Sequence, residues 1–176
     1  MSTYQIDPAH SSAQFKVRHM MISNVKGEFD KISGTVTYDP AIPTASTVEA
    51  NIETASISTR DPQRDTHLKS GEFLDVEKFP AITFKSKTVT STGAGSFAVA
   101  GDLTIHGVSK QVTLDVEELT EETKDPWGNM RRGAAAKTRI HRKDFGMHFN
   151  VPLEAGGFVV GEDVDLTIDV ELIRQA

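Results

Sequence analysis

The chain contains no cysteine. Disulfides, thiolate chemistry and cysteine-based zinc sites are therefore excluded. Long hydrophobic runs are also missing, and no stretch approaches the roughly 20 consecutive apolar residues that a transmembrane helix needs. We therefore do not expect an integral membrane protein.

A clustered positive charge is absent as well. The 19 Lys and Arg residues are scattered, and the formal net charge is −6. Nucleic-acid binding needs a basic stripe that displaces counterions, so no nucleic-acid partner is expected. The same net charge opposes adsorption to anionic lipid headgroups. Residues 1–7 lack the basic and apolar segments of a secretory signal, which predicts a cytoplasmic protein.

What the sequence does have is a repeated alternation of apolar and polar residues. The clearest run covers residues 164–172, and similar runs occur at 13–19, 46–54, 97–105 and 112–117. Period-two alternation is typical of antiparallel strands with one solvated and one buried face. Neither an internal repeat nor a linker interrupts the pattern, so residues 1–176 are predicted to form a single all-β domain of about eight strands.

The alternation changes phase once, in the second strand region. Val25 and Phe29 share one parity, whereas Ile32 and Val36 share the other. A shift of one residue would turn the later side chains to the opposite face of the sheet. A bulge or bend near Lys31–Gly34 keeps both apolar sets on the inside.

One segment carries helix signals instead. Asp61 is a candidate N-cap, Pro62 suits the first helical position, and Gly71 lies past the end. We predict a short helix between the strands. The step Ile105–Val108 is predicted to be a tight hairpin turn, because it contains His-Gly between two alternating runs.

Eight strands of this length favour a closed, extended antiparallel β-barrel, since closure removes unpaired strand edges. A barrel of this size is either filled by side chains or holds one small ligand. Several predicted inward residues are small, which favours a lined tunnel. Compensation of small residues by large ones across a filled core stays open as the alternative. The small inward residues are Ser46, Ala50, Ser86, Gly101, Ala134, Ala136 and Thr138.

Four collinear groups of motifs resemble the YceI-like family of lipocalin-like, polyisoprenoid-binding proteins. The resemblance extends from Tyr4 to about Leu172. It implies an extended barrel with an apolar tunnel, a neighbouring helical element, and an isoprenoid quinone, polyprenyl compound or fatty amide as ligand, without known catalysis. Many members are exported, and the missing leader departs from that habit. The motifs are Asp7–Ser12 with Phe15–His19 and Val25–Phe29, Arg64–Ser70 with Phe79–Phe84, Gly101–Val108, and Arg142–Met147.

The six histidines raise the question of a metal site. One grouping places His10, His19 and His67 at a common barrel end, and another joins His141 and His148. No pair has the helical HxxxH spacing, and zinc needs three or four converging ligands. We predict no metal and expect histidines that hydrogen-bond to the backbone at strand ends.

Acid–base catalysis by Asp65 and Asp75, with His67 as proton carrier, is the other polar hypothesis. Asp65 lies within one helical turn of Arg64, so a structural role that pins the helix to the barrel rim is favoured over catalysis. Contact with a ligand headgroup is the third option.

Together these features predict a protein that binds, stores or transports a long-chain apolar ligand, with no catalytic cofactor and with a bound isoprenoid lipid or quinone. An enzyme is not expected. The alternatives are a barrel enzyme acting on a small apolar substrate, and a ligand-free structural or stress protein with a filled core or a dimer interface. A homodimer is the one protein partner considered. His19, His67 and Arg142 are predicted rim contacts of the ligand. The predicted tunnel residues are Phe15, Val17, Phe29, Ile52, Phe84, Leu103, Leu114, Ile140, Leu166 and Ile168.

Overall fold

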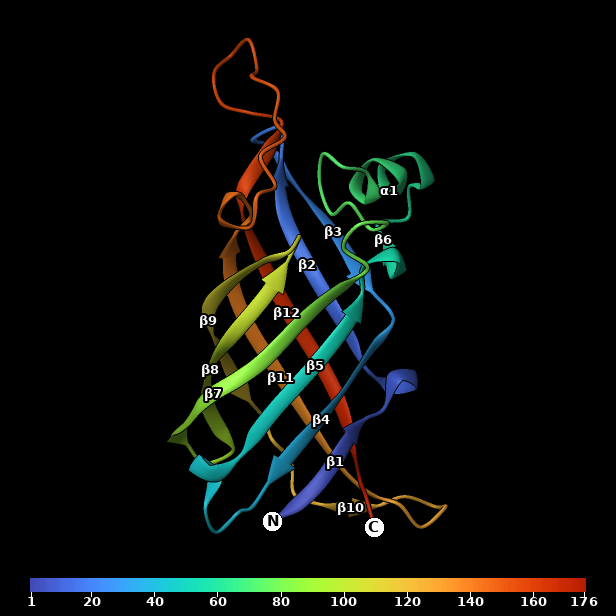
Figure 1. The fold of residues 1–176 in the computed structure, drawn as a ribbon, viewed down its shortest axis with the longest axis vertical. Coiled ribbons are helices and arrows are strands. Elements are labelled where there is room, and N and C mark those ends of the chain that lie inside the picture. The colour runs from blue at the N-terminus through green and yellow to red at the C-terminus, as the bar shows by residue number, and fades with distance from the viewer.

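The computed structural model describes all residues 1–176, and nearly all of its regular structure is β-sheet (Figure 1). One α-helix, α1 (Pro62–Lys69), and four 3-10 turns interrupt the strands: η1 (Pro8–His10), η2 (Pro43–Ala45), η3 (Thr54–Ser56) and η4 (Arg142–Phe145). The strands are β1 (Ser2–Ile6), β2 (Ser12–His19), β3 (Ser23–Phe29), β4 (Ile32–Tyr38), β5 (Thr47–Glu53), β6 (Ile57–Ser58), β7 (Ala81–Gly93), β8 (Ser96–Ile105), β9 (Val108–Glu117), β10 (Thr123–Lys124), β11 (Met130–His141) and β12 (Val160–Arg174).

All strand pairings are antiparallel, and the sheet closes on itself because β11 pairs with β9 on one side and with β12 on the other. Around the barrel, β1 with β2, β3 with β4, and β5 with β6 each act as one long bent strand. In the lower half β1 pairs with β12 and β4, and in the upper half β2 pairs with β12 and β3. The result is a closed eight-stranded barrel, as the alternating sequence predicts.

The predicted phase change falls between β3 and β4. Phe29 ends β3 and Ile32 begins β4, and both side chains are buried, whereas Asp30 and Lys31 between them are exposed. Two outward residues in succession therefore restore the apolar set to the inside. Gly34 lies just beyond this bend, where a Cβ would meet the Glu49 carbonyl oxygen at 2.2 Å. The absence of a side chain there lets β4 and β5 approach closely.

The predicted helix and hairpin are both present. Asp61 caps α1, since its Oδ1 accepts hydrogen bonds from the backbone amides of Gln63 and Arg64. Asp65 accepts two more, from the backbone and the hydroxyl of Thr59, at 2.8 and 2.6 Å. These contacts fix the helix to the chain segment that follows β6. The β8–β9 turn is tight.

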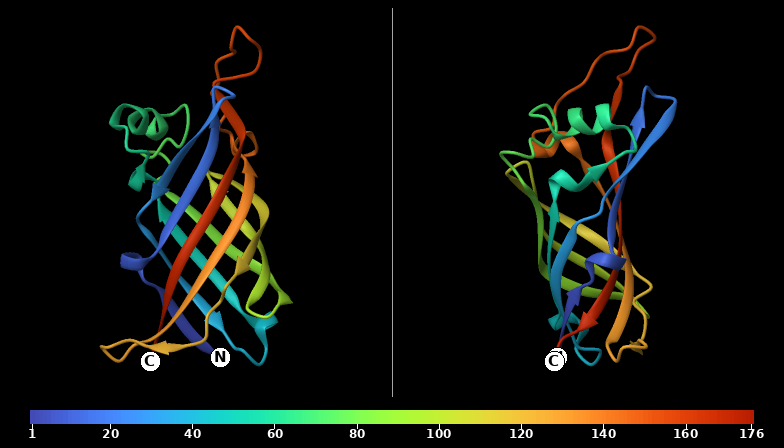
Figure 2. Two further views of the ribbon diagram at one scale, coloured as in Figure 1. Left: turned by 180° about the vertical axis from the view of Figure 1, so that it is seen from behind. Right: turned by 90° about the vertical axis from the view of Figure 1, so that its right-hand side faces the viewer.

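The two ends of the barrel differ. Both termini and β10 lie at the lower end, where the segment between β9 and β11 crosses beneath the barrel (Figure 1). At the upper end lie α1, the β2–β3 turn, and the long loop before β12, which projects beyond the strands (Figure 2). None of the helices has the length and apolar character to span a membrane.

Candidate functional site

A large apolar cavity occupies the barrel. Its volume is about 530 Å³, within the range of ordinary small-molecule sites. Of its 51 lining residues 41 are hydrophobic, and no Asp, Glu or Lys is among them. The lining extends from Tyr4 and Leu172 near the lower end to His67 and Val151 at the upper end. The cavity therefore follows the length of the barrel and suits an extended apolar molecule.

All thirteen residues that the sequence selects as tunnel or rim positions border this cavity. Their role in contacting a ligand stays a prediction. The placement of those on strands follows from parity, because inward side chains alternate along each strand, whereas His67 lies on α1 and Arg142 in η4. These residues are Phe15, Val17, His19, Phe29, Ile52, His67, Phe84, Leu103, Leu114, Ile140, Arg142, Leu166 and Ile168.

Five of the seven small residues predicted to point inward lie on the cavity wall. Ser46, Ala50, Ala134, Ala136 and Thr138 line the cavity and leave it room.

Ser86 and Gly101 instead accommodate their neighbours. The Ser86 hydroxyl accepts a hydrogen bond from the Val48 backbone amide at 2.8 Å. A Cβ on Gly101 would lie 2.7 Å from the Phe84 ring. Compensation of small residues by large ones therefore holds at Gly101, while the cavity exists elsewhere in the barrel.

The predicted rim residues lie in different surroundings. The His67 ring packs edge-on against Phe73 and Phe149, with centroid distances of 5.1 and 4.8 Å. His67 Nε2 also lies 3.3 Å from a Glu72 carboxylate oxygen. His19 ends β2 at the upper end of the cavity. The His19 and His67 side chains are therefore half-buried next to the cavity and place polar atoms near its upper end.

Arg142 is the exception among the rim residues. It is only 2% exposed, and its guanidinium donates to four backbone carbonyls, those of Met147, Phe149, Val160 and Gly161, at 2.7–3.2 Å. These bonds hold the start of the long upper loop against β12. The geometry favours a structural task for Arg142 over a headgroup contact.

Asp65 and Asp75, the carboxylates of the acid–base hypothesis, do not line the cavity. Asp65 directs Oδ1 at Thr59, as described above, and so has the structural role that the sequence favours. The arrangement brings no carboxylate pair to the apolar interior.

A polar group at the lower end of the cavity was missed by the sequence reasoning. Arg132 is 8% exposed and stacks over Tyr38 at 5.1 Å from the ring centroid. Its Nε donates to the Tyr4 hydroxyl and its Nη1 to the Thr120 carbonyl. The Tyr4 hydroxyl in turn donates to Glu122 at 2.7 Å.

Parity would have revealed this arginine, because Arg132 alternates in phase with Ala134 and Ala136 on β11. Burial of Tyr4 raises the pKa of its hydroxyl, and the hydrogen bond from Arg132 acts in the opposite direction. Ser46 also borders the cavity, and its buried hydroxyl has no hydrogen-bond partner. The lower end therefore offers polar contacts inside an otherwise apolar wall.

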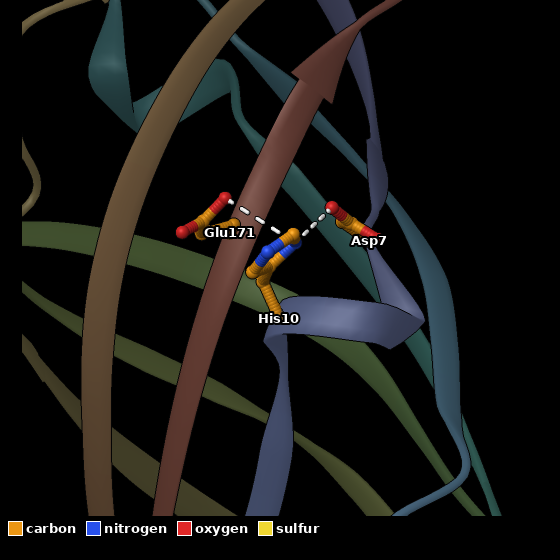
Figure 3. A group of neighbouring side chains, drawn as sticks. All are labelled: Asp7, His10 and Glu171. Atoms are coloured by element: carbon orange, nitrogen blue, oxygen red, sulfur yellow. Dashed lines mark hydrogen bonds and ion pairs between the residues drawn. The ribbon is translucent and has the colours of Figure 1, made fainter.

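The histidines do not gather as the sequence hypothesis allowed. His19 and His67 share the upper end, but His10 lies lower on the outside of the barrel, beside Asp7 and Glu171 (Figure 3). These three form the only group of three or more His, Asp or Glu residues in the chain that could together hold a metal ion, with candidate ligand atoms all within 4.8 Å of one another.

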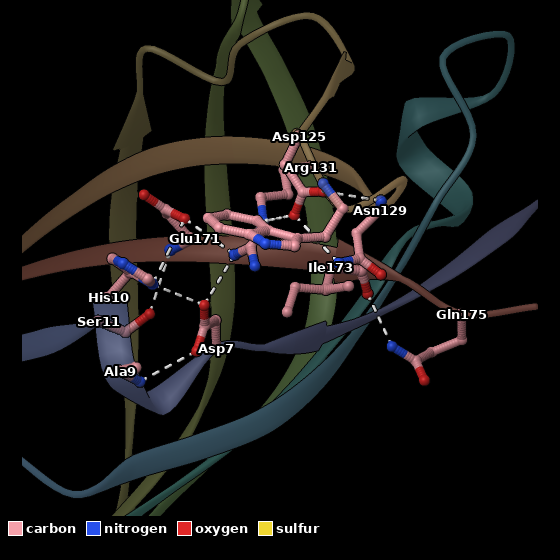
Figure 4. A network of polar contacts seen from close by, with 11 residues as sticks. Asp7, Ala9, His10, Ser11, Asp125, Asn129, Arg131, Glu171, Ile173 and Gln175 are labelled. Carbon is pink, nitrogen blue, oxygen red and sulfur yellow. Dashed lines mark hydrogen bonds and ion pairs between the residues drawn. The ribbon is translucent and has the colours of Figure 1, made fainter.

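The Arg131 guanidinium already pairs with the two carboxylates of this group. Arg131 Nη1 donates to Asp7 Oδ2 at 2.7 Å and to Glu171 Oε2 at 3.0 Å (Figure 4). The Arg131 guanidinium is the main reason why the pKa of Asp7 is held at about 2, with His10 adding to the effect. The hydrogen bond to Asp7 raises the pKa of His10. The arrangement is that of an ion-pair network.

A closed eight-stranded antiparallel barrel around an apolar cavity defines a lipocalin-like barrel. The model of the YceI-like domain matches residues 4–172, so the chain belongs to the YceI-like family. This agrees with the resemblance carried by the motifs.

Relatives of similar sequence are UPF0312 proteins. One from Vibrio cholerae is 42% identical over 146 residues, covering 82% of this chain and 77% of the relative. One from Staphylococcus aureus is 38% identical over 172 residues, covering 97% of each chain. The match therefore includes almost the whole length of the staphylococcal protein.

Solved structures share the fold. The YCEI protein of Campylobacter jejuni is 31% identical with a TM-score of 0.74, and 90% of each chain is covered. Burkholderia cenocepacia BcnA has a TM-score of 0.81 at 22% identity, covering 94% of this chain and 98% of BcnA. A polyisoprenoid-binding domain from Saccharophagus degradans has a TM-score of 0.71 at 17% identity, covering 99% and 100%. At these last two identities the likeness concerns the fold.

Proposed function

We propose that this protein binds one long-chain apolar ligand of isoprenoid or fatty type along the barrel and serves in its storage or transport. The observation that carries the proposal is the cavity of about 530 Å³ with 41 hydrophobic lining residues out of 51. Burial of an apolar chain there would contribute about 25 cal/mol per Å² of buried surface, less the cost of ordering the ligand. Membership of the YceI-like family and the fold shared with a polyisoprenoid-binding domain support the isoprenoid class.

Binding is favoured over catalysis by the chemistry of the wall. An enzyme acting on an apolar substrate needs a titratable group near the reacting atoms. The cavity lining contains no carboxylate and no lysine, and its two histidines, His19 and His67, lie at the upper end rather than in the depth of the barrel. The deep ionisable pair, Tyr4 and Arg132, is engaged with Glu122 and Thr120. A protein with a filled core would have no such cavity, so the ligand-free alternative has less support.

The direct test is extraction of the purified protein with organic solvent after denaturation, followed by mass spectrometry. A stoichiometric isoprenoid or fatty molecule is the expected result. If no lipid is found and an added isoprenoid quinone does not bind, the proposal fails.

A matched pair of variants tests the place of binding. Ala136→Phe puts a ring into the cavity wall, whereas Thr113→Phe puts the same ring on the exposed face of β9. Quinone affinity should fall at least about tenfold in Ala136→Phe and stay unchanged in Thr113→Phe, with both folded by circular dichroism. Ala50→Phe is the second cavity variant if Ala136→Phe does not fold. Equal affinity of the folded variants would contradict binding inside the barrel.

A further inference from the structure

Two loops at the upper end carry most of the large apolar side chains that the protein exposes. They supply five of the eight exposed large hydrophobic residues, each between 42% and 75% exposed. We call these five residues the apolar tip. The tip consists of Met20, Met21 and Ile22 from the β2–β3 turn, and Val151 and Phe158 from the loop before β12.

The two loops form one joined surface. The Met20 backbone amide donates to the Val159 carbonyl at 2.7 Å, and the Val159 amide donates to the Val151 carbonyl at 3.0 Å. Met21 packs over Gly157, where a Cβ would lie 3.0 Å from Met21 Cγ. In Figure 2 the loop before β12 projects beyond the strands, and the β2–β3 turn lies at its base. The exposed side chains are therefore held next to one another by the backbone.

Two methionines of the β2–β3 turn have a backbone conformation that long side chains rarely adopt. Met20 and Met21 have φ angles of 50° and 65°, in the left-handed region. Glycine or asparagine occupies that region at lower cost than a long side chain. Strained backbone of this kind is concentrated at functional positions. Two consecutive large apolar side chains at such positions indicate that the side chains themselves are used.

The two loops of the tip carry almost no charged side chains of their own, although the neighbouring Arg18 guanidinium donates to the Met21 carbonyl at 3.1 Å. Residues 20–24 contain no ionisable side chain, and residues 149–159 contain only Glu154, although 25% of the whole chain is charged. A nearly neutral apolar projection suits a surface that offers hydrocarbon rather than opposite charge. The net charge of −6 further disfavours an anionic membrane surface.

The tip is continuous with the cavity. Val151 belongs to the tip and also lines the cavity, and the neighbouring Val159 lines it too. An apolar chain that leaves the upper end of the barrel would therefore meet the tip before it meets water. Exposed apolar surface that continues a ligand site is typical of a docking region.

We propose that the apolar tip docks into the interfacial layer of a lipid bilayer whose headgroups carry no net charge, so that the ligand passes between the bilayer and the cavity. The inference rests on the proposed function. Side chains of this kind insert by burying apolar area, which needs no electrostatic attraction. A second copy of the chain fits less well, because five side chains are far fewer than the roughly 20–30 residues per side of a stable protein interface.

The test is co-sedimentation with large unilamellar vesicles of phosphatidylcholine. The double variant Ile22→Asp/Phe158→Asp should lose vesicle association on the order of tenfold or more, because each charge would enter the apolar layer. Ile42→Asp is the matched control, since Ile42 is 56% exposed but lies before η2 at the lower end. It should bind vesicles like the wild type, and raising the salt concentration should change little.

Fluorescence gives an independent readout, because the chain has a single tryptophan, Trp127, which is exposed in the turn before β11 at the lower end. In a Trp127→Phe background, Phe158→Trp should shift its emission to shorter wavelength when phosphatidylcholine vesicles are added. The wild-type emission should not shift. Absence of a shift in the tip variant would overturn the proposal.

Two further outcomes are decisive. Unchanged vesicle binding by the double aspartate variant, or none by the wild type, would overturn membrane docking. A wild-type dimer that the same substitutions convert to monomer, without an effect on vesicle binding, would assign the tip to self-association and overturn membrane docking too.

Binding of a short-chain isoprenoid quinone without vesicles separates the two proposals. The double variant should bind it like the wild type, and failure of both to bind would count against the proposed function alone.

Discussion

Arg131 on β11 donates a hydrogen bond from Nη1 to the Asp7 carboxylate at 2.7 Å, across 124 positions of the chain. The same guanidinium bonds Asp125 through Nε at 2.7 Å and Glu171 at 3.0 Å (Figure 4). Asp7 lies at the bend between β1 and β2, and its side chain is only 11% exposed. One arginine thus connects this bend, β12, and the turn before β11.

Arg131→Met should clearly lower the urea midpoint, because it leaves the shielded Asp7 carboxylate without its main partner. Urea unfolding at pH 7 measures the change. Arg139→Met is the control on the same strand and should change the midpoint much less, since the Arg139 side chain is 65% exposed and an exposed ion pair contributes little. Equal losses in the two variants would contradict a special role for Arg131.

The depressed pKa of Asp7 predicts acid sensitivity. Its pKa is about 2 in the folded protein against an ordinary value of 3.8, mainly because of the Arg131 hydrogen bond. The unfolded state therefore binds the proton more readily, and the stabilisation from Asp7 is complete above pH ~4 and lost as the pH falls through ~2.

Urea midpoints between pH 2 and 7 test this dependence. Asp7→Asn should lower stability at neutral pH and flatten the loss below pH ~4. Asp30→Asn, at an exposed position between β3 and β4, should leave the wild-type profile unchanged. Parallel profiles for Asp7→Asn and the wild type would exclude Asp7 as the source of the acid sensitivity.

Arg142→Met should destabilise the protein by roughly 2–4 kcal/mol, since several backbone carbonyls lose their donor at once. Cleavage by a protease within residues 146–159 should become faster, because those bonds hold the loop to β12. Lys143→Met is the control, as the Lys143 side chain is 39% exposed and pairs only with Glu162. An unchanged rate of cleavage within this loop in Arg142→Met would contradict the structural role of Arg142.

Ser46→Ala should stabilise the ligand-free protein by about 1 kcal/mol, because it removes a buried hydroxyl that has no partner. Ser56→Ala should have the opposite effect, since the Ser56 hydroxyl donates to the Glu53 carbonyl at 2.7 Å. Thermal unfolding of both variants gives the comparison. A loss of stability in Ser46→Ala would mean that its hydroxyl makes a favourable contact.

The sequence by itself determined the barrel wall. Alternation on β12, the phase change between Phe29 and Ile32, and the capped helix after Asp61 are local signals, and each is present where the pattern places it. The ten residues chosen as tunnel positions all border the cavity, and so do the three chosen as rim contacts, of which His67 and Arg142 lie outside the strands. Local periodicity suffices here because the inward and outward faces of a strand alternate whatever its partner is.

Only the tertiary structure decided which polar residues meet. Asp7 and Arg131 are joined by the closure of β11 on β12, which no local pattern specifies. His10 proved to lie outside the barrel, away from His19 and His67, because the bend between β1 and β2 places it beside Glu171. The apolar tip likewise depends on two distant loops that meet at one barrel end. Such contacts depend on strand order and register, which are set by long-range packing.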